Sequence, residues 1–269
     1  MKPHTPLYMS CIVLVVFTQM LFGQTSSNVT LLSNFGIGEG DSKAVFAAGS
    51  IVFYGLGNKV QIASFSTPSA PVKIGSVILS DVVEGLVRTS IGGTQYLVVS
   101  GGSKMWLINV QNPTAPSLVS TTDVAPGTVC EGIATSGSYA YVAAGAAGFK
   151  VYSIANPAAP VPVASIDSLA YCENVVISSP YAFIAADGPG YVGRSFIFDI
   201  STPSAPVYKS TILGYGGYHQ YMSVRSGYAY ICDYNAGLET GSRSGCAPVV
   251  QTASGVPDAV ANVPVSNHP

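Results

Sequence analysis

Short runs of apolar and β-branched residues recur along this chain, and turn-forming residues separate them. Residues 139–142 (Tyr-Ala-Tyr-Val) and 149–154 (Phe-Lys-Val-Tyr-Ser-Ile) are two such runs, each with Gly or Ser before it. Runs of roughly four to eight such residues, bounded by Gly, Pro, Asn and Ser, are typical of β-strands joined by tight turns. We therefore expect almost no helix between residues 43 and 238.

Four of these runs are followed by one motif, Pro-x-Ala-Pro. The motif lies in residues 65–71, 110–116, 154–160 and 200–206, and its first prolines are Pro68, Pro113, Pro157 and Pro203. Successive first prolines are 45, 44 and 46 residues apart. A period this constant indicates that one structural unit is repeated along the chain.

Each motif stands in the same local pattern of four apolar runs, of which three precede the prolines and one follows them. The resulting units are residues 43–79, 83–122, 130–166 and 172–213. Four strands in a repeat of this length predict an all-β fold, a β-propeller of four-stranded antiparallel blades. The prolines would lie in the loop after the third strand, where a missing N–H removes no ladder hydrogen bond. A β-sandwich spaces its strands similarly and is the alternative, although it needs no repeated motif.

Residues 148–160, with residues 138–143 upstream of them, resemble the LVIVD repeat. That family is named for its repeat, occurs in bacterial and archaeal surface or exported proteins, and is understood to form β-propellers. The resemblance covers residues 43–238. It implies the fold and says nothing of an activity. The first two copies depart from the family pattern, because Asn58-Lys59 and Ser103-Lys104 put a polar pair after the glycine.

The pattern of strands weakens toward the end of the chain. A partial fifth unit begins at Gln220 and is lost after Leu238, so we expect the repeat domain to span residues 24–238. Residues 239–269 are predicted to be a poorly ordered tail. Residues 28–35 resemble a fourth strand that could complete the last blade, and a truncated form of a longer propeller is the alternative.

The first 23 residues have the features of a secretory signal peptide. A short polar start is followed by an apolar stretch at residues 7–22, with Gly23 before the expected mature start at Gln24. An uncleaved membrane anchor is the alternative, and no later segment is apolar enough to span a membrane. Cleavage predicts an exported protein that is extracellular, on the cell surface or periplasmic.

Composition argues against a nucleic acid as the partner. The chain is 48% hydrophobic and only 9% charged, with a formal net charge of −2. Its eleven Lys and Arg residues are scattered, so there is no basic patch for nucleic acid. No catalytic motif, cofactor motif or metal-ligand spacing is present, and we expect no enzyme activity, cofactor or metal.

Polar residues stand at equivalent places at the start of successive units. Glu84, Glu131, Glu173 and Gln220 open the first strand of four units, and Lys43 takes the corresponding place in the unit before them. The first strand of a blade lies nearest the propeller axis, so these side chains are predicted to form a polar ring at one channel mouth. Repulsion among the carboxylates would favour a cation or a hydroxyl-rich ligand. The alternative is a packing role, with the glutamates accepting backbone N–H groups.

A second candidate site is the glycine- and tyrosine-rich segment 214–221. Its aromatic and imidazole groups would offer flat, hydrogen-bonding faces to a sugar or peptide, and they are Tyr215, Tyr218, His219 and Tyr221. Alternatively, these residues pack on neighbouring strands. Asp187 and Asp233, which follow second strands, are interpreted as turn caps.

Two cysteines, Cys130 and Cys172, are one repeat apart and each precedes a glutamate. Equivalent positions on adjacent blades make a disulfide between them a prediction, with two free thiols as the alternative. These features favour a non-enzymatic binding or scaffold module at the cell surface or outside the cell, with an unknown protein, peptide or glycan as ligand. One alternative is a hydrolase or lyase with an acidic site at the propeller mouth. Another is a truncated fragment without independent function.

Overall fold

The structure is a computed structural model that describes residues 32, 40–187, 192–214, 217–225, 228–233, 237–244 and 247–252. The chain divides into two compact units, Met1–Leu32 and Ser33–Pro269, and every described strand lies in the second. The predicted signal peptide at residues 1–23 falls outside the described residues, and so does the strand expected at residues 28–35, apart from Leu32. In the described part of the chain, no helix is long and apolar enough to cross a membrane.

The described strands form five antiparallel sheets, each made of four strands consecutive in sequence. Sheet 1 holds β1 (Val45–Ala48), β2 (Ile51–Leu56), β3 (Lys59–Ser64) and β4 (Val72–Ile78). Sheet 2 holds β5 (Gly85–Ile91), β6 (Thr94–Gly101), β7 (Lys104–Asn109) and β8 (Ser117–Asp123). Sheet 3 holds β9 (Gly132–Ser136), β10 (Tyr139–Ala143), β11 (Phe149–Ser153) and β12 (Val161–Ile166). Sheet 4 holds β13 (Tyr171–Ser178), β14 (Tyr181–Asp187), β15 (Gly193–Asp199) and β16 (Val207–Leu213), and sheet 5 holds β17 (His219–Arg225), β18 (Tyr228–Asp233), β19 (Gly237–Ser244) and β20 (Ala247–Thr252).

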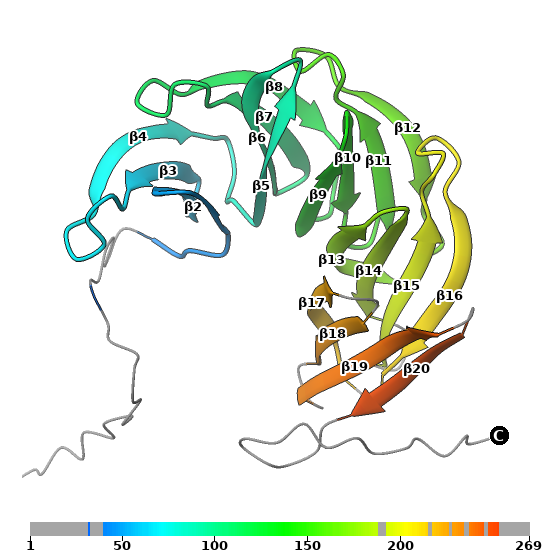
Figure 1. The fold of residues 1–269 in the computed structure, drawn as a ribbon. Coiled ribbons are helices and arrows are strands. Elements are labelled where there is room, and N and C mark those ends of the chain that lie inside the picture. The colour runs from blue at the N-terminus through cyan, green and yellow to red at the C-terminus, as the bar shows by residue number, and fades with distance from the viewer. Residues whose placement is uncertain are drawn as a thin grey trace, which may run out of the picture. The chain divides into compact units, whose positions relative to one another are not determined.

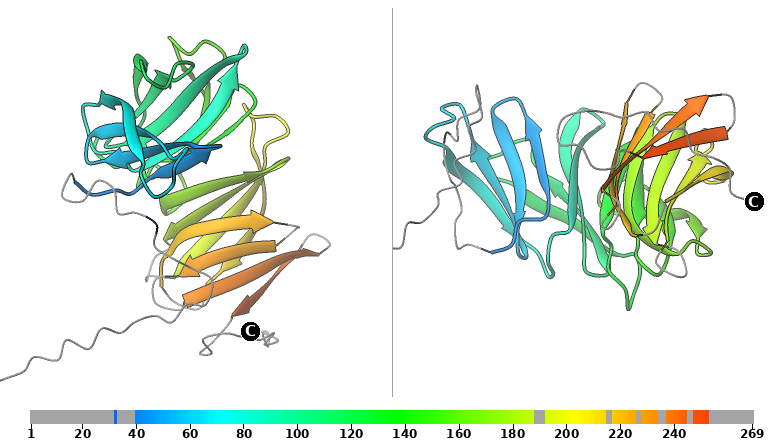
Figure 2. Two further views of the ribbon diagram at one scale, coloured as in Figure 1. Left: turned by 60° about the vertical axis from the view of Figure 1, so that its left-hand side comes forward. Right: turned by 90° about the horizontal axis from the view of Figure 1, so that it is seen from below.

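These sheets are the blades of a β-propeller, as the repeat predicted. They follow one another round an arc with the first strand of each blade innermost and the fourth outermost (Figures 1 and 2). The innermost strands of successive blades, β1, β5, β9, β13 and β17, contact each other in turn. Each described sheet is complete within its own stretch of chain, and no described strand closes a ring by pairing with another blade.

The proline motif lies between the third and fourth strands of sheets 1 to 4, which confirms the prediction. In each of these loops the alanine of Pro-x-Ala-Pro donates its N–H to the carbonyl three residues earlier, as Ala70 does to Thr67 over 2.9 Å. A β-bulge stands in the same place in each of these sheets, for example between Ile62 and Ala63 in β3. A bulge increases local twist, so the repeated motif sets how each outer strand bends around its blade.

The hydrophobic core is divided among the interfaces between successive blades. Trp106 of sheet 2 packs in a cluster with Ile62 of sheet 1, while Val98 and Met105 of sheet 2 pack against sheet 3. Alternate residues of a middle strand therefore serve two interfaces, which explains why these strands are apolar on both faces. Outer strands are held to the next proline loop, because Ser120 Oγ donates a 2.7 Å hydrogen bond to the Pro157 carbonyl.

Sheet 5 corrects the predicted domain boundary at residue 238. Strands β19 and β20 continue the last blade to Thr252, within the segment expected to be a poorly ordered tail. The pairing of β19 with β20 is regular from Glu239 to Ser244, without the bulge of the other blades. The Pro-x-Ala-Pro motif identified the third and fourth strands of the other blades. The hairpin of β19 and β20 lacks this motif, so the sequence pattern did not reveal it. Because β20 is the fourth strand of this blade, the blade needs no strand from residues 28–35.

Candidate functional site

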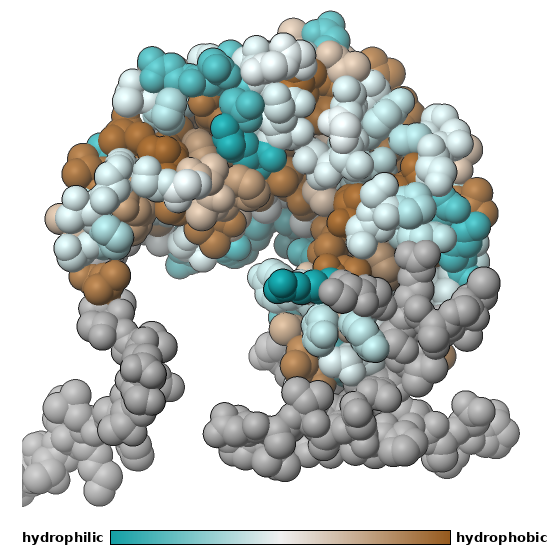
Figure 3. All heavy atoms as spheres, in the orientation of Figure 1, coloured by the Kyte–Doolittle hydropathy of each residue, from teal (hydrophilic) through white to brown (hydrophobic). Residues whose placement is uncertain are grey.

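A cavity of about 470 Å³ lies among the innermost strands of the five blades. Figure 3 shows the molecule hollowed on the inner side of the arc. The five polar residues of the predicted ring all line this cavity, and they are Lys43, Glu84, Glu131, Glu173 and Gln220. Asn174 and Tyr221 add further polar groups to its wall.

Backbone hydrogen bonds between successive blades bring these side chains together. The residue before each glutamate donates its N–H to a glycine carbonyl of the preceding blade: Val83 to Gly57 over 2.8 Å, Cys130 to Gly102 over 2.6 Å and Cys172 to Gly145 over 3.0 Å. These glycines have φ between 48° and 55°, the left-handed region that favours glycine in the turn between the second and third strands. The same contact in sheets 2 to 4 therefore aims the three glutamates at the axis.

Small residues allow the first strands to approach closely. Gly85 and Gly132 directly follow Glu84 and Glu131. A Cβ at Gly85 would lie 3.0 Å from the Glu131 carbonyl oxygen, and one at Gly132 would lie 2.8 Å from the Asn174 Cα. The Glu-Gly pair thus combines a polar group for the cavity with the space that the next blade needs.

Two of the glutamates have partners from the neighbouring blade. Lys43 Nζ donates to Glu84 Oε1 over 2.8 Å, and this bond raises the pKa of Lys43. The Tyr171 hydroxyl donates to Glu131 Oε1 over 2.9 Å, while burial, followed by the effect of this carboxylate, raises the pKa of Tyr171. Side chains of the neighbouring blade therefore hold both glutamates.

Glu173 differs from the other members of the ring because its neighbours are carboxylates. Burial, then the charges of Glu131 and Asp187, raise its pKa to about 7. Burial also raises the pKa of Asp187, at the end of β14, to about 6, although the hydrogen bond from Glu173 opposes this shift. The two carboxyl groups interact with each other and therefore titrate as a coupled pair.

The tyrosine-rich segment does not form one surface in the described residues. His219 is completely buried at the start of β17, Tyr218 is half-buried, and Tyr221 is 60% exposed at the cavity wall. Tyr215 lies outside the described residues. The structure therefore assigns Tyr221 to the axial cavity and His219 to the interior of the last blade.

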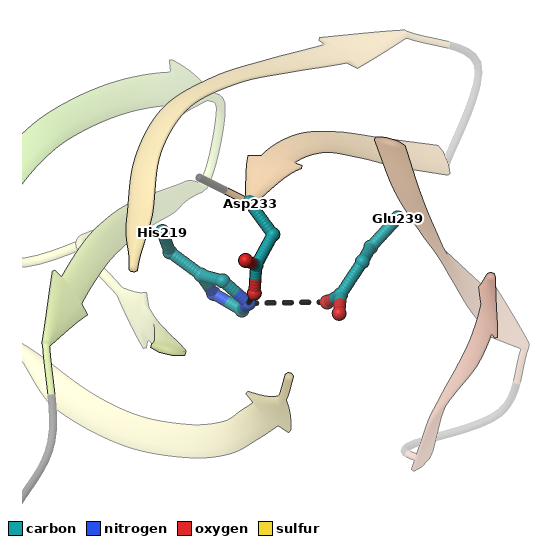
Figure 4. A group of neighbouring side chains, drawn as sticks. All are labelled: His219, Asp233 and Glu239. Atoms are coloured by element: carbon teal, nitrogen blue, oxygen red, sulfur yellow. Dashed lines mark hydrogen bonds and ion pairs between the residues drawn. The ribbon is translucent and has the colours of Figure 1, made fainter. Parts of the chain in front are cut away.

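His219 meets three polar side chains in that interior. Its Nδ1 lies 2.8 Å from Ser195 Oγ, and its Nε2 lies 3.1 Å from Glu239 Oε2 and 3.9 Å from Asp233 Oδ2. Figure 4 shows that the imidazole and the two carboxyl groups point toward one another. A serine, histidine and glutamate in contact suggest a hydrolytic triad, but all three side chains are buried and a nucleophile must reach its substrate. None of the three side chains is exposed to a substrate in this structure.

The repeats that build the last three blades match a known repeat family. The LVIVD repeat matches residues 126–168, 171–213 and 216–239, which contain sheets 3 and 4 and the start of sheet 5. The last three blades of this chain therefore contain LVIVD repeats. The unmatched first two units are the copies that depart from the family pattern after their glycines.

Solved structures support the propeller fold of this chain. A protein of unknown function from Desulfotomaculum acetoxidans DSM 771 matches with a TM-score of 0.64 and 14% identity, over 80% of this chain and 72% of that one. The periplasmic gluconolactonase PpgL of Pseudomonas aeruginosa matches with a TM-score of 0.62 and 11% identity, over 75% and 66%. The computationally designed Ika8 protein matches with a TM-score of 0.56 and 13% identity; the match covers 74% of this chain but only 57% of the designed one. At these identities the likeness establishes the fold alone. A search of curated proteins found no match.

The predicted disulfide between Cys130 and Cys172 is wrong, because both thiols are free. Cys130 packs in the core between sheets 2 and 3, whereas Cys172 packs in the core between sheets 3 and 4. Equivalent positions in successive LVIVD repeats thus face different interfaces. Burial raises the pKa of both thiols to about 12.

The sequence pattern did not identify several residues of the axial cavity and of the cluster around His219. Tyr171 and Asp187 were missed as partners of the ring, and Ser195, Asp233 and Glu239 as partners of His219. Asp233 was noticed only as a turn cap, although it lies directly opposite His219 in the strand pairing. Strand register would have revealed that pairing. No sequence signal marked Glu239, because the repeat pattern fades before it.

Proposed function

We propose that this propeller is a non-enzymatic binding module whose axial cavity holds a positively charged group of a peptide or protein. The proposal rests on one observation: Glu84, Glu131 and Glu173 all line the same cavity. Among the ring residues, Lys43 is the cationic one, and it pairs with Glu84. The cavity volume of about 470 Å³ is in the range of small-ligand sites.

Electrostatics favour a cation over a neutral ligand. The pKa of Glu173 is raised to about 7 by burial and by two neighbouring carboxylates, so negative charge predominates around Glu173. A lysine or arginine side chain placed there would stabilise the ionised form of Glu173 and displace its proton. The expected signal-peptide cleavage would place this module outside the cytoplasm, on the cell surface or in the periplasm.

The test compares ligands of different charge on the full chain by calorimetry at pH 7. Oligo-lysine and oligo-arginine peptides represent the cationic ligand, and neutral oligosaccharides represent the hydroxyl-rich one. We expect the cationic peptides to bind with release of protons, which is measured as a dependence of the binding heat on the buffer. Tighter binding of the sugars would overturn the choice of ligand class.

Matched variants locate the binding. Glu131→Gln with Glu173→Gln removes two carboxylates from the cavity, and Asp123→Asn with Asp167→Asn removes two from the outer strands. Asp123 and Asp167 are exposed and pair with Lys104 and Lys150. We expect at least tenfold weaker binding in the first double variant only. Equal weakening in both would mean that only net charge matters.

A second candidate is acid–base catalysis in the same cavity. Glu173, with a pKa raised to about 7, is suited to donate or accept a proton at neutral pH. The structural neighbours include a protein described as a gluconolactonase, and a general acid or base can assist the opening of a lactone by water. Incubation of the full chain with six-carbon sugar lactones distinguishes the two functions, because turnover that Glu173→Gln abolishes would establish catalysis.

A further inference from the structure

The interior of the last blade holds a second polar site, separate from the axial cavity. Strand register brings its residues to one face of sheet 5: His219 is directly opposite Asp233, and Glu239 is opposite Ile231, which lies two residues before Asp233 on the same face. All three ionisable side chains are fully buried. Their nearest nitrogen and oxygen atoms lie within 4.8 Å of one another.

This interior is apolar in the neighbouring blade. Cys172 is opposite Ala186 in sheet 4, and a bulge at Glu173 follows, just as His219 is opposite Asp233 and a bulge at Gln220 follows. His219 and Asp233 therefore occupy the positions of a cysteine and an alanine that pack in the core between blades. Polar groups have replaced a packed apolar pair at the one described blade that lacks the proline loop.

Carboxyl groups outnumber the imidazole in this cluster. Asp233 and Glu239 both face the single ring of His219. Buried charge is costly unless it is neutralised, either by extra protons or by a cation. Asp187 adds a third carboxyl group, which interacts with both His219 and Asp233.

The geometry around His219 suits a metal ion. Nδ1 lies against Ser195 Oγ, an acceptor that would fix the tautomer in which Nε2 carries the lone pair toward the carboxylates. Nε2 is 3.1 Å and 3.9 Å from the two carboxylate oxygens, close to the roughly 3 to 3.5 Å between donors around an ion with bonds of about 2.1 Å. Gly214 leaves space beside these atoms, because a Cβ there would lie 2.5 Å from Nε2 and 3.3 Å from Asp233 Oδ2.

We propose that His219, Asp233 and Glu239 bind one divalent transition-metal ion, zinc or manganese. One imidazole and two carboxylates suit these ions, whereas calcium prefers oxygen ligands alone. The ion neutralises the buried carboxylates. It also joins the start of β17, the end of β18 and β19, and so stabilises the last blade. Complete burial makes the site structural.

The test uses the full chain without a histidine tag. Protein treated with EDTA is titrated separately with Zn²⁺, Mn²⁺ and Ca²⁺ by calorimetry, and its melting temperature is measured. We expect one equivalent of zinc or manganese to bind with a dissociation constant below micromolar and to raise the melting temperature, with calcium at least a hundredfold weaker. Absence of binding by zinc and manganese, or tighter binding of calcium, would overturn the proposal.

Variants and spectroscopy assign the ligands. His219→Gln and Glu239→Gln should each weaken binding at least a hundredfold, and Asp123→Asn, an exposed carboxylate of sheet 2, should leave it unchanged. X-ray absorption of the zinc-loaded wild-type chain needs no variant to fold, and it should show one imidazole, oxygen ligands and no sulfur. Sulfur in the coordination shell would instead place the ion at a cysteine such as the exposed Cys232 and refute the site.

Discussion

Tyr171 of β13 donates a hydrogen bond from its hydroxyl to Glu131 of the preceding blade, over 2.9 Å. Burial, the largest influence, and the adjacent carboxylate keep the pKa of Tyr171 above its usual value, so the hydroxyl remains a donor. The bond joins sheets 3 and 4 at the wall of the axial cavity. It also fixes the orientation of one ring carboxylate, while Glu173 is left beside Asp187.

Tyr171→Phe should destabilise the protein by about 1 kcal/mol, because it removes a hydrogen bond to a charged and half-buried acceptor. Urea unfolding followed by fluorescence of the single tryptophan, Trp106, measures the change. Tyr208→Phe is the matched control, since its hydroxyl contacts Thr211 over 3.0 Å on an exposed strand. A loss at Tyr208 as large as that at Tyr171 would contradict the assigned role.

Stability should fall as pH rises from about 4.5 to about 7 because of Glu173. Its pKa is about 7 in the folded protein against 4.5 for an ordinary glutamate, so in this window the folded state binds more protons than the unfolded state. The contribution is fully present below pH 4.5 and is lost by the time pH passes 7. Glu131, Asp187 and Glu84 raise this pKa after burial, and Asp187 titrates in the same direction.

The difference in melting temperature between wild type and Glu173→Gln isolates this effect from other groups. We expect the wild type to lose stability relative to the variant from pH 4.5 through pH 7, with the change levelling off by about pH 8. Asp123→Asn serves as control for a lost carboxylate on the outer surface. A difference that stays constant over the whole range would show that Glu173 titrates normally.

Gly75→Ala should destabilise the contact between sheets 1 and 2. A Cβ at Gly75 of β4 would lie 2.3 Å from the Pro113 carbonyl oxygen in the next proline loop, so that loop must move. Overpacking of this kind costs about 1 to 3 kcal/mol. The neighbouring exposed Ser76→Ala should change the free energy of unfolding by less than about 0.5 kcal/mol. Equal stability of the two variants would show that the loop is not packed against β4.

Cys130 and Cys172 should resist alkylation in the native protein, because both thiols are buried and their pKa is raised to about 12. Cys232 is exposed and should react. Iodoacetamide labelling followed by peptide mapping without reduction measures each site, with labelling in denaturant as the control. Recovery of a peptide pair linked through Cys130 and Cys172 would contradict the free thiols.

The repeat by itself determined the blades. Pro68, Pro113, Pro157 and Pro203 recur at a constant period, and a constant period requires the same local structure each time. Glu84, Glu131, Glu173 and Gln220 were placed at the axis by the same reasoning, since equivalent residues of a propeller converge there. Local patterns therefore suffice wherever one unit is copied from the unit before it.

Only the tertiary structure showed how one repeat unit differs from the next. The period cannot tell which interface a side chain faces, and so Cys130 and Cys172 were paired although each packs toward its own preceding blade. The end of the last blade carried no proline landmark, and β20 was missed. His219, Asp233 and Glu239 come from three strands, and only strand register and the packing of sheet 5 against Ser195 of sheet 4 bring them together. Contacts of this kind depend on which strands pair across the sheet, which no local pattern records.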